Sequence, residues 1–255
     1  MPRSTAPSPT SSRRTRTGPG RGNTHVSGGP HLPLRWSAIA ARHPSALLLA
    51  VQLASLLVYP LVDGRDTRVL FSAFTLVAVP LAVWVVFRSR AANWFAWALA
   101  VPAMLLAVAA LALGLPALAV ASAVLESLLY FYAAGALIVY MLEDHTVTVD
   151  ELFAAAATFT LLAWGFAYAF LVCQALAPGG FTGMLEPERP RRWLELLFLS
   201  FSTLSGTGNG DVVPLSPYAR VLVMLEQFAG VGYIAAVVSR LIALSIVRHR
   251  GRDRG

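Results

Sequence analysis

Six long apolar runs divide this 255-residue chain, and they constrain its fold more than any other feature. A helix needs about 20 consecutive apolar residues to cross a bilayer. The runs meet this length, and they lie at residues 44–62, 67–87, 94–113, 116–142, 152–177 and 217–247. Because lipid leaves backbone polar groups no partner but each other, each run is expected to be an α-helix. The pattern predicts an all-α membrane protein with six transmembrane helices.

The composition agrees with a membrane protein and excludes an ordinary soluble domain. Hydrophobic residues make up 56% of the chain and charged residues 13%, whereas a soluble domain carries about 25% charged residues. The net charge of +7 would suit nucleic acid, but all 20 basic residues are arginines that gather at the two ends and in short loops. That placement encodes membrane topology, so the lipid bilayer is the expected partner and no nucleic acid is predicted.

The arginines also predict the orientation of the chain. With six spans, thirteen arginines fall on one side of the membrane and six on the other. Since the arginine-rich side is the cytoplasmic one, both termini are expected in the cytoplasm of a multi-pass protein of the cell membrane.

Four segments follow from these patterns. Residues 1–43 are basic and rich in Ser, Pro and Gly, a composition that is typical of a disordered tail. Residues 44–143 are predicted to form a four-helix transmembrane region. Residues 144–247 hold spans five and six and the segment between them, and residues 248–255 are a basic cytoplasmic tail.

A short apolar segment between spans five and six is the most specific feature of the chain. Residues 192–205 cannot cross a bilayer, and they are predicted to form a re-entrant helix. The strip Gly206-Thr-Gly-Asn-Gly-Asp211 follows it, and a last long helix begins near residue 217. Glycines at alternate positions allow positive φ without a Cβ penalty. Successive carbonyls can then point one way and replace the hydration shell of a cation.

This strip resembles the signature Thr-Val-Gly-Tyr-Gly-Asp of potassium channels. Gly208, Gly210 and Asp211 match that signature, and Pro214 matches the proline that follows it. The sequences around spans five and six also resemble small bacterial members of that family. The matching residues include Glu226, Gly230, Tyr233 and Arg240 of span six. Those members carry four extra spans before a two-helix pore module. The resemblance implies a homotetramer that conducts K⁺ passively through the carbonyls of Gly206, Thr207, Gly208 and Asn209, with no cofactor and no enzymatic activity.

Three positions depart from the signature, so the filter is atypical. Gly206 stands where the family has Thr, Thr207 where it has Val, and Asn209 where it has an aromatic residue. Gly206 has no hydroxyl to offer an ion, and Asn209 is too small to brace the strip as the aromatic does. The first hypothesis is that K⁺/Na⁺ selectivity is reduced. The alternative is that Asn209 maintains the geometry by hydrogen bonds to Trp193 or Ser202.

Several residues outside the strip are candidates for supporting roles. Trp193, Ser202, Thr203 and Glu226 are expected to support the filter, with Glu226 either paired to a polar group of the pore helix or solvated at the interface. Asp211 is expected to form an acidic ring at the outer mouth or to cap a turn locally. Gly230 and Gly232 are candidates for a hinge, or for close helix packing. Arg240 is expected to snorkel to the cytoplasmic interface.

The pattern of spans leaves two other classes of protein open. A secondary transporter is expected to show broken helices in both halves, and this chain shows one re-entrant element. A channel-like subunit that no longer conducts would have the same pattern. Span four has no series of arginines at every third position, so steep voltage gating is not expected.

Overall fold

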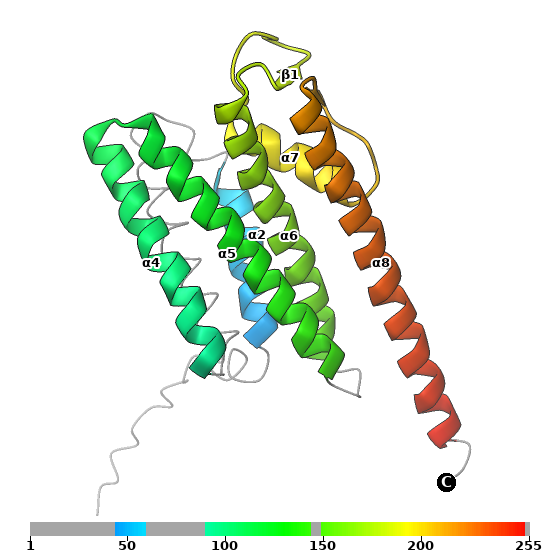
Figure 1. Cartoon of the computed structure of the whole chain (residues 1–255). Helices are drawn as coiled ribbons and strands as arrows, with labels where there is room; N and C mark the ends of the chain where they lie inside the picture. The colour runs from blue at the N-terminus through cyan, green and yellow to red at the C-terminus, as the bar shows by residue number, and fades with distance from the viewer. Residues whose placement is uncertain (1–43, 60–89, 144–148, 253–255) are drawn as a thin grey trace, which may run out of the picture. The chain divides into compact units, whose positions relative to one another are not determined.

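The computed structural model describes residues 44–59, 90–143 and 149–252, and the side chains of 44, 90–93, 143, 241 and 243–252 are outside that description. The described part is mainly helical (Figure 1). In chain order the elements are α2 (Pro44–Val58), α4 (Arg90–Leu113), α5 (Pro116–Glu143), α6 (Val149–Leu176), β1 (Phe181–Gly183), α7 (Trp193–Leu204), β2 (Val212–Pro214) and α8 (Pro217–Arg252).

Four of the described helices are long and apolar enough to cross a membrane. They are Trp94–Leu113, Pro116–Leu142, Val149–Leu176 and Pro217–Arg240, and they coincide with the predicted spans three to six. The first predicted span appears as a shorter apolar helix, α2, over its described residues. The predicted span at 67–87 and the tail at 1–43 lie outside the described residues. Helix α8 continues to Arg252, so the basic segment that starts at residue 248 begins as helix.

Helix α6 is the central element of the described part, and α2, α5, α7 and α8 all pack against it. Ser45 Oγ of α2 donates to Asp150 at 2.9 Å, and Gln52 Nε2 donates to the Ala157 carbonyl at 3.5 Å. Both pairs are 105 residues apart, so α2 and α6 run side by side in the same direction. Small side chains on α6, such as Ala154 and Ala157, are fully buried and allow the close approach that membrane helices use.

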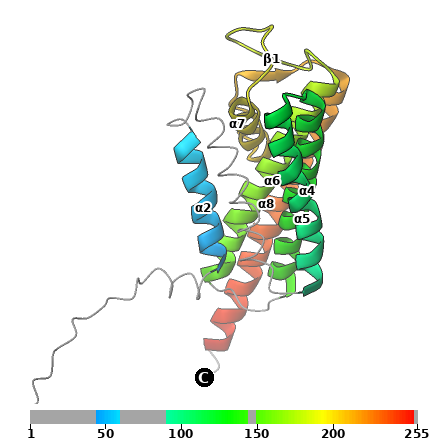
Figure 2. The ribbon, with the colours of Figure 1, turned by 90° about the vertical axis from the view of Figure 1, so that its left-hand side faces the viewer.

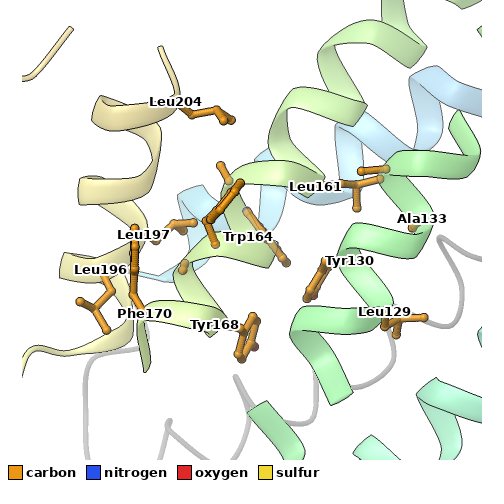
Figure 3. Packing of buried hydrophobic residues seen from close by; sticks show 14 of the residues in the cluster. Leu129, Tyr130, Ala133, Leu161, Trp164, Tyr168, Phe170, Leu196, Leu197 and Leu204 are labelled. Carbon is orange, nitrogen blue, oxygen red and sulfur yellow. The ribbon is translucent and has the colours of Figure 1, made fainter. Parts of the chain in front are cut away.

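Aromatic side chains fill the core where α5, α6 and α7 meet. Trp164 lies edge-on to Tyr130 with ring centroids 5.4 Å apart, and Tyr130 stacks on Tyr168 at 5.6 Å (Figure 3). Leu196 and Leu197 of α7 are buried against the same cluster. Such large rings bury much apolar surface, so α7 is held on α6 by apolar packing.

A two-stranded sheet, which was not predicted, lies outside the helices. Strand β1 pairs antiparallel with β2, with Phe181 opposite Pro214 and Gly183 opposite Val212. Figures 1 and 2 both show β1 at the same end of α6 as α7. The strands have three residues each, so the chain remains mainly α-helical as predicted.

Candidate functional site

The Glu195 side chain caps the start of helix α7. The Glu195 carboxylate accepts a hydrogen bond from the Arg192 backbone N–H and a second, at 2.7 Å, from Arg189 Nη2. Burial raises the pKa of the Glu195 carboxyl, but these hydrogen bonds outweigh it, and the pKa lies below its usual value. An acidic side chain in the first turn also suits the positive end of the helix dipole. The start of α7 is therefore well defined, at one residue from the predicted start of 192.

The strip turns back on the last turn of α7. The Gly206 N–H donates to the Thr203 carbonyl at 3.1 Å, and the Gly208 N–H donates to the Ser202 carbonyl at 3.2 Å. Gly206 and Gly208 have φ of +72° and +64°, values that favour glycine strongly over residues with a Cβ. The predicted positive φ thus occurs at two alternate positions of the strip.

The carbonyls of residues 206–209 differ from these N–H groups in the part of the chain that the structure describes. Among the described residues, no hydrogen bond is accepted by the carbonyls of residues 206–209, although the N–H groups of Gly206 and Gly208 are engaged. All residues of the strip are exposed in the single chain. A run of carbonyls that is held by its N–H groups and left open on its oxygen side is the arrangement that can coordinate a cation.

The Thr207 side chain faces α7. Its Oγ1 donates to the Ser202 carbonyl at 3.2 Å and lies 3.0 Å from Ser205 Oγ. The hydroxyl therefore fastens the strip to the end of the helix and is not among the oxygens that the strip leaves open.

The outer end of the strip is tied to the sheet. The Met184 N–H donates to the Asp211 carbonyl at 3.2 Å and extends the β1–β2 ladder by one hydrogen bond. The Asp211 side chain is exposed, and the part of the chain that the structure describes offers its carboxylate no hydrogen bond or ion pair. The described residues therefore show no local cap by this carboxylate, and the acidic ring at the outer mouth stays a prediction.

Ser202 and Thr203 contact the strip as predicted supports would, but they do so through their main-chain carbonyls. Trp193 lies elsewhere. It begins α7, roughly 17 Å from Leu204 at 1.5 Å per residue, and it packs on Trp164 and Tyr168 with ring centroids 5.6 and 5.8 Å away. The hydrogen bond from Asn209 to Trp193 or Ser202 is not present among the described residues. The structure therefore corrects the role of Trp193 from filter support to core packing.

Glu226 lies fully buried behind α7. Its carboxyl oxygen hydrogen-bonds with Ser200 Oγ, which also contacts the Ala163 carbonyl of α6 at 2.7 Å. The pairing with a polar group of the pore helix is thus what the structure shows, and the solvated alternative is wrong. Ser200 was missed at the sequence level because one more serine in an apolar helix carries no signal of its own.

Gly230 allows α8 to touch the end of α7. A Cβ at Gly230 would meet the backbone of Leu204, with the carbonyl carbon at 2.8 Å and the Cα at 2.9 Å. No atom lies within 4 Å of a Cβ built at Gly232. Close packing is therefore the role that the structure gives Gly230, while the hinge at Gly232 stays a prediction.

Arg240 does not extend freely to the interface. Its Nη2 donates at 2.8 Å to the Glu151 carboxylate, whose side chain is 4% exposed. The snorkelling prediction is corrected to an ion pair between α8 and the first turn of α6. Glu151 was missed because nothing in the sequence relates it to a residue 89 positions away.

Residues 156–245 match a family model whose description is ion channel. The match runs from α6 through α7 and the strip into α8. No curated protein and no solved structure matches the chain. The two-helix pore region and its apolar spanning helices thus support an ion channel in a membrane.

Proposed function

We propose that the chain is one subunit of a passive cation channel of the potassium-channel class, and that the strip Gly206–Asp211 is its selectivity filter. The observation that carries the proposal is the set of open carbonyls at residues 206–209, held from behind by N–H bonds to Ser202 and Thr203. Carbonyl rings of this kind replace the water around K⁺. The negative end of the α7 dipole, next to the strip, favours a cation as well.

The site is complete only when several copies meet. One strip supplies oxygens from one side, whereas a dehydrated cation needs them all round. Four copies around a cyclic axis close the ring. The uncovered apolar face of α8 supports this assembly; its exposed members include Met224, Phe228 and Val231. Both termini are proposed to face the cytoplasm of the cell membrane, as the arginines predict.

Reduced K⁺/Na⁺ selectivity is the finer part of the proposal. Gly206 has no side-chain oxygen for an ion, and the Thr207 hydroxyl is turned back to Ser202. The exposed Asn209 amide makes no hydrogen bond within the described residues that would brace the strip. A strip with fewer side-chain oxygens and less support should form a wider pore, in which the ion keeps more of its hydration shell.

Ion flux into proteoliposomes tests both parts. Wild-type protein should pass K⁺, and its reversal potential under bi-ionic K⁺/Na⁺ conditions should lie nearer zero than that of the double variant Gly206→Thr with Asn209→Tyr. A strongly K⁺-shifted reversal potential in the wild type would contradict reduced selectivity. Gly208→Ala places a Cβ at positive φ and should abolish flux. Gly114→Ala is the matched control, because it also places a Cβ at positive φ in open space but lies between α4 and α5, away from the strip.

The same experiment also tests whether the chain conducts ions at all. If neither the wild type nor the double variant conducts while both form inserted tetramers, the chain is a non-conducting channel-like subunit.

A further inference from the structure

The strip lacks the side-chain brace that its geometry needs. Asn209 and Gly210 offer little surface to pack behind it, and both are exposed in the single chain. The inner end of the strip is fastened to Ser202 and Thr203, but these contacts stop at Gly208. Other contacts must therefore hold residues 209–211, the outer half of the strip.

The outer half is fixed from the sheet. Val212 lies opposite Gly183, and the Met184 N–H bonds the Asp211 carbonyl at 3.2 Å. The position of the last filter residue therefore follows the position of β1 and of the residue after it.

Strand β1 rests on a buried arginine. Arg191 is 4% exposed, and a Cβ added at Gly183 would lie 3.2 Å from its guanidinium carbon. The guanidinium donates to two loop carbonyls: Nη2 bonds the Glu186 carbonyl, and Nε bonds the Arg189 carbonyl at 2.9 Å. The planar fork of arginine holds both contacts in fixed directions, whereas the ammonium of lysine is a compact charge on a flexible stem.

The backbone of Arg191 is itself anchored to a spanning helix. Its N–H donates to Gln174 Oε1 at 2.7 Å, and Gln174 Nε2 donates back to its carbonyl at 3.0 Å. Because Gln174 belongs to α6, Arg191 joins this helix to the loop and to β1. These contacts of Arg191 with Gln174, with Gly183 and with the loop carbonyls are called the clamp below. Glu195 of α7, with an oxygen 4.0 Å from Arg191 Nη1, supplies the nearby negative charge.

We infer that Arg191 is a positioning residue of the filter. Through Gly183 and β1 it sets β2 and the outer end of the strip at Asp211, and so it replaces the aromatic brace that Asn209 does not provide. The inference rests on the proposed function for its consequence in ion flow, but the placement of the strip can be measured without any flux.

Hydrogen exchange and flux on the full-length tetramer in lipid test the inference together. In Arg191→Lys, amides of residues 206–215 should exchange about tenfold faster than in the wild type, because a local opening there becomes easier. Amides of α7 and α8 should keep their rates. Met184→Pro removes the N–H that holds Asp211 and should have the same local effect, and K⁺ flux should fall severalfold in both variants.

Two matched controls separate the clamp from a general effect. Met184→Ala keeps the backbone N–H and removes only a side chain that is 81% exposed. Arg192→Lys makes the same chemical change at the exposed neighbouring position. Both should retain wild-type exchange in the strip.

The outcomes are distinct. Exchange of residues 206–215 that stays at the wild-type rate in Arg191→Lys overturns the inference, whatever Met184→Pro does. So does equal acceleration in Arg192→Lys. If exchange responds as expected but wild-type liposomes pass no cation, the clamp stands and the proposed function fails.

Discussion

Arg240 of α8 and Glu151 of α6 form an ion pair at 2.8 Å. The neighbouring Asp150 accepts hydrogen bonds from the backbone and hydroxyl of Ser45 in α2. The first turn of α6 thus connects α2 on one side to α8, the helix that follows the strip, on the other.

The ion pair predicts a specific pattern of stability. Arg240→Gln leaves the Glu151 charge buried without its partner and should destabilise the protein by roughly 3 kcal/mol. The double variant with Glu151→Gln should lose less than the two single variants added together, because their effects are coupled. Thermal unfolding of all three in detergent checks this. Arg220→Gln, which changes an exposed arginine of α8, should be nearly neutral, and fully additive losses would contradict the pair.

Gly230 and Gly232 provide a second matched comparison. In Gly230→Ala the new methyl group meets the Leu204 backbone, which cannot rotate away as a side chain can. The end of α7 must then move, at a cost of about 1–3 kcal/mol for an overpacked contact, and K⁺ flux should fall with it. Gly232→Ala meets open space and should stabilise the helix slightly. Flux and thermal unfolding measured on both variants decide the point; equal effects would mean that helix propensity matters more than the contact.

The helices could be predicted from the sequence because their signal is local. The short apolar helix was expected at 192–205 and lies at Trp193–Leu204, because the glycine strip marks its end. The last helix was expected to begin at residue 217, where Ser216 caps it at 3.2 Å and Pro217 takes the first position. A proline is well suited to that position.

The contacts between elements could not be predicted in the same way. In the sequence Arg191 is one of several charged residues in a loop. Only the fold places it against Gly183 and Gln174. The strands β1 and β2 have three residues each, too few for a period-two pattern to stand out. Trp193 was expected to support the filter because it belongs to the short helix that precedes the strip. In the structure its ring packs on Trp164 at the end of α7 that is far from the strip.

Glu195 predicts how stability depends on acid. Its folded-state pKa lies below the usual value, so its stabilising contribution is present above the unfolded pKa of about 4.3. The contribution is lost as the pH falls through the lower folded value. The melting temperature of the wild type should therefore exceed that of Glu195→Gln at neutral pH, and the two should converge in acid. Glu188→Gln, a change at an exposed loop position, should follow the wild type throughout; a constant gap between wild type and Glu195→Gln would contradict the prediction.

Ser200 sits between two acceptors and has one hydroxyl proton to offer. It contacts the Ala163 carbonyl at 2.7 Å and also the Glu226 carboxyl. Both contacts are satisfied at once only if Glu226 carries a proton and donates to Ser200 Oγ, because a hydroxyl donates once and accepts the rest. A glutamine at position 226 can donate in the same way through its amide.

Glu226→Gln should therefore be nearly neutral in thermal unfolding and should keep the flux of the wild type. Ser200→Ala removes the partner of a fully buried group and should cost about 1–3 kcal/mol. In the double variant Ser200→Ala with Glu226→Leu no polar group is left unsatisfied there, so part of that loss should return. If Glu226→Gln were instead as harmful as Ser200→Ala, the carboxyl group would have to act as a charge behind the pore helix, and the hydrogen-bond account of this contact would be wrong.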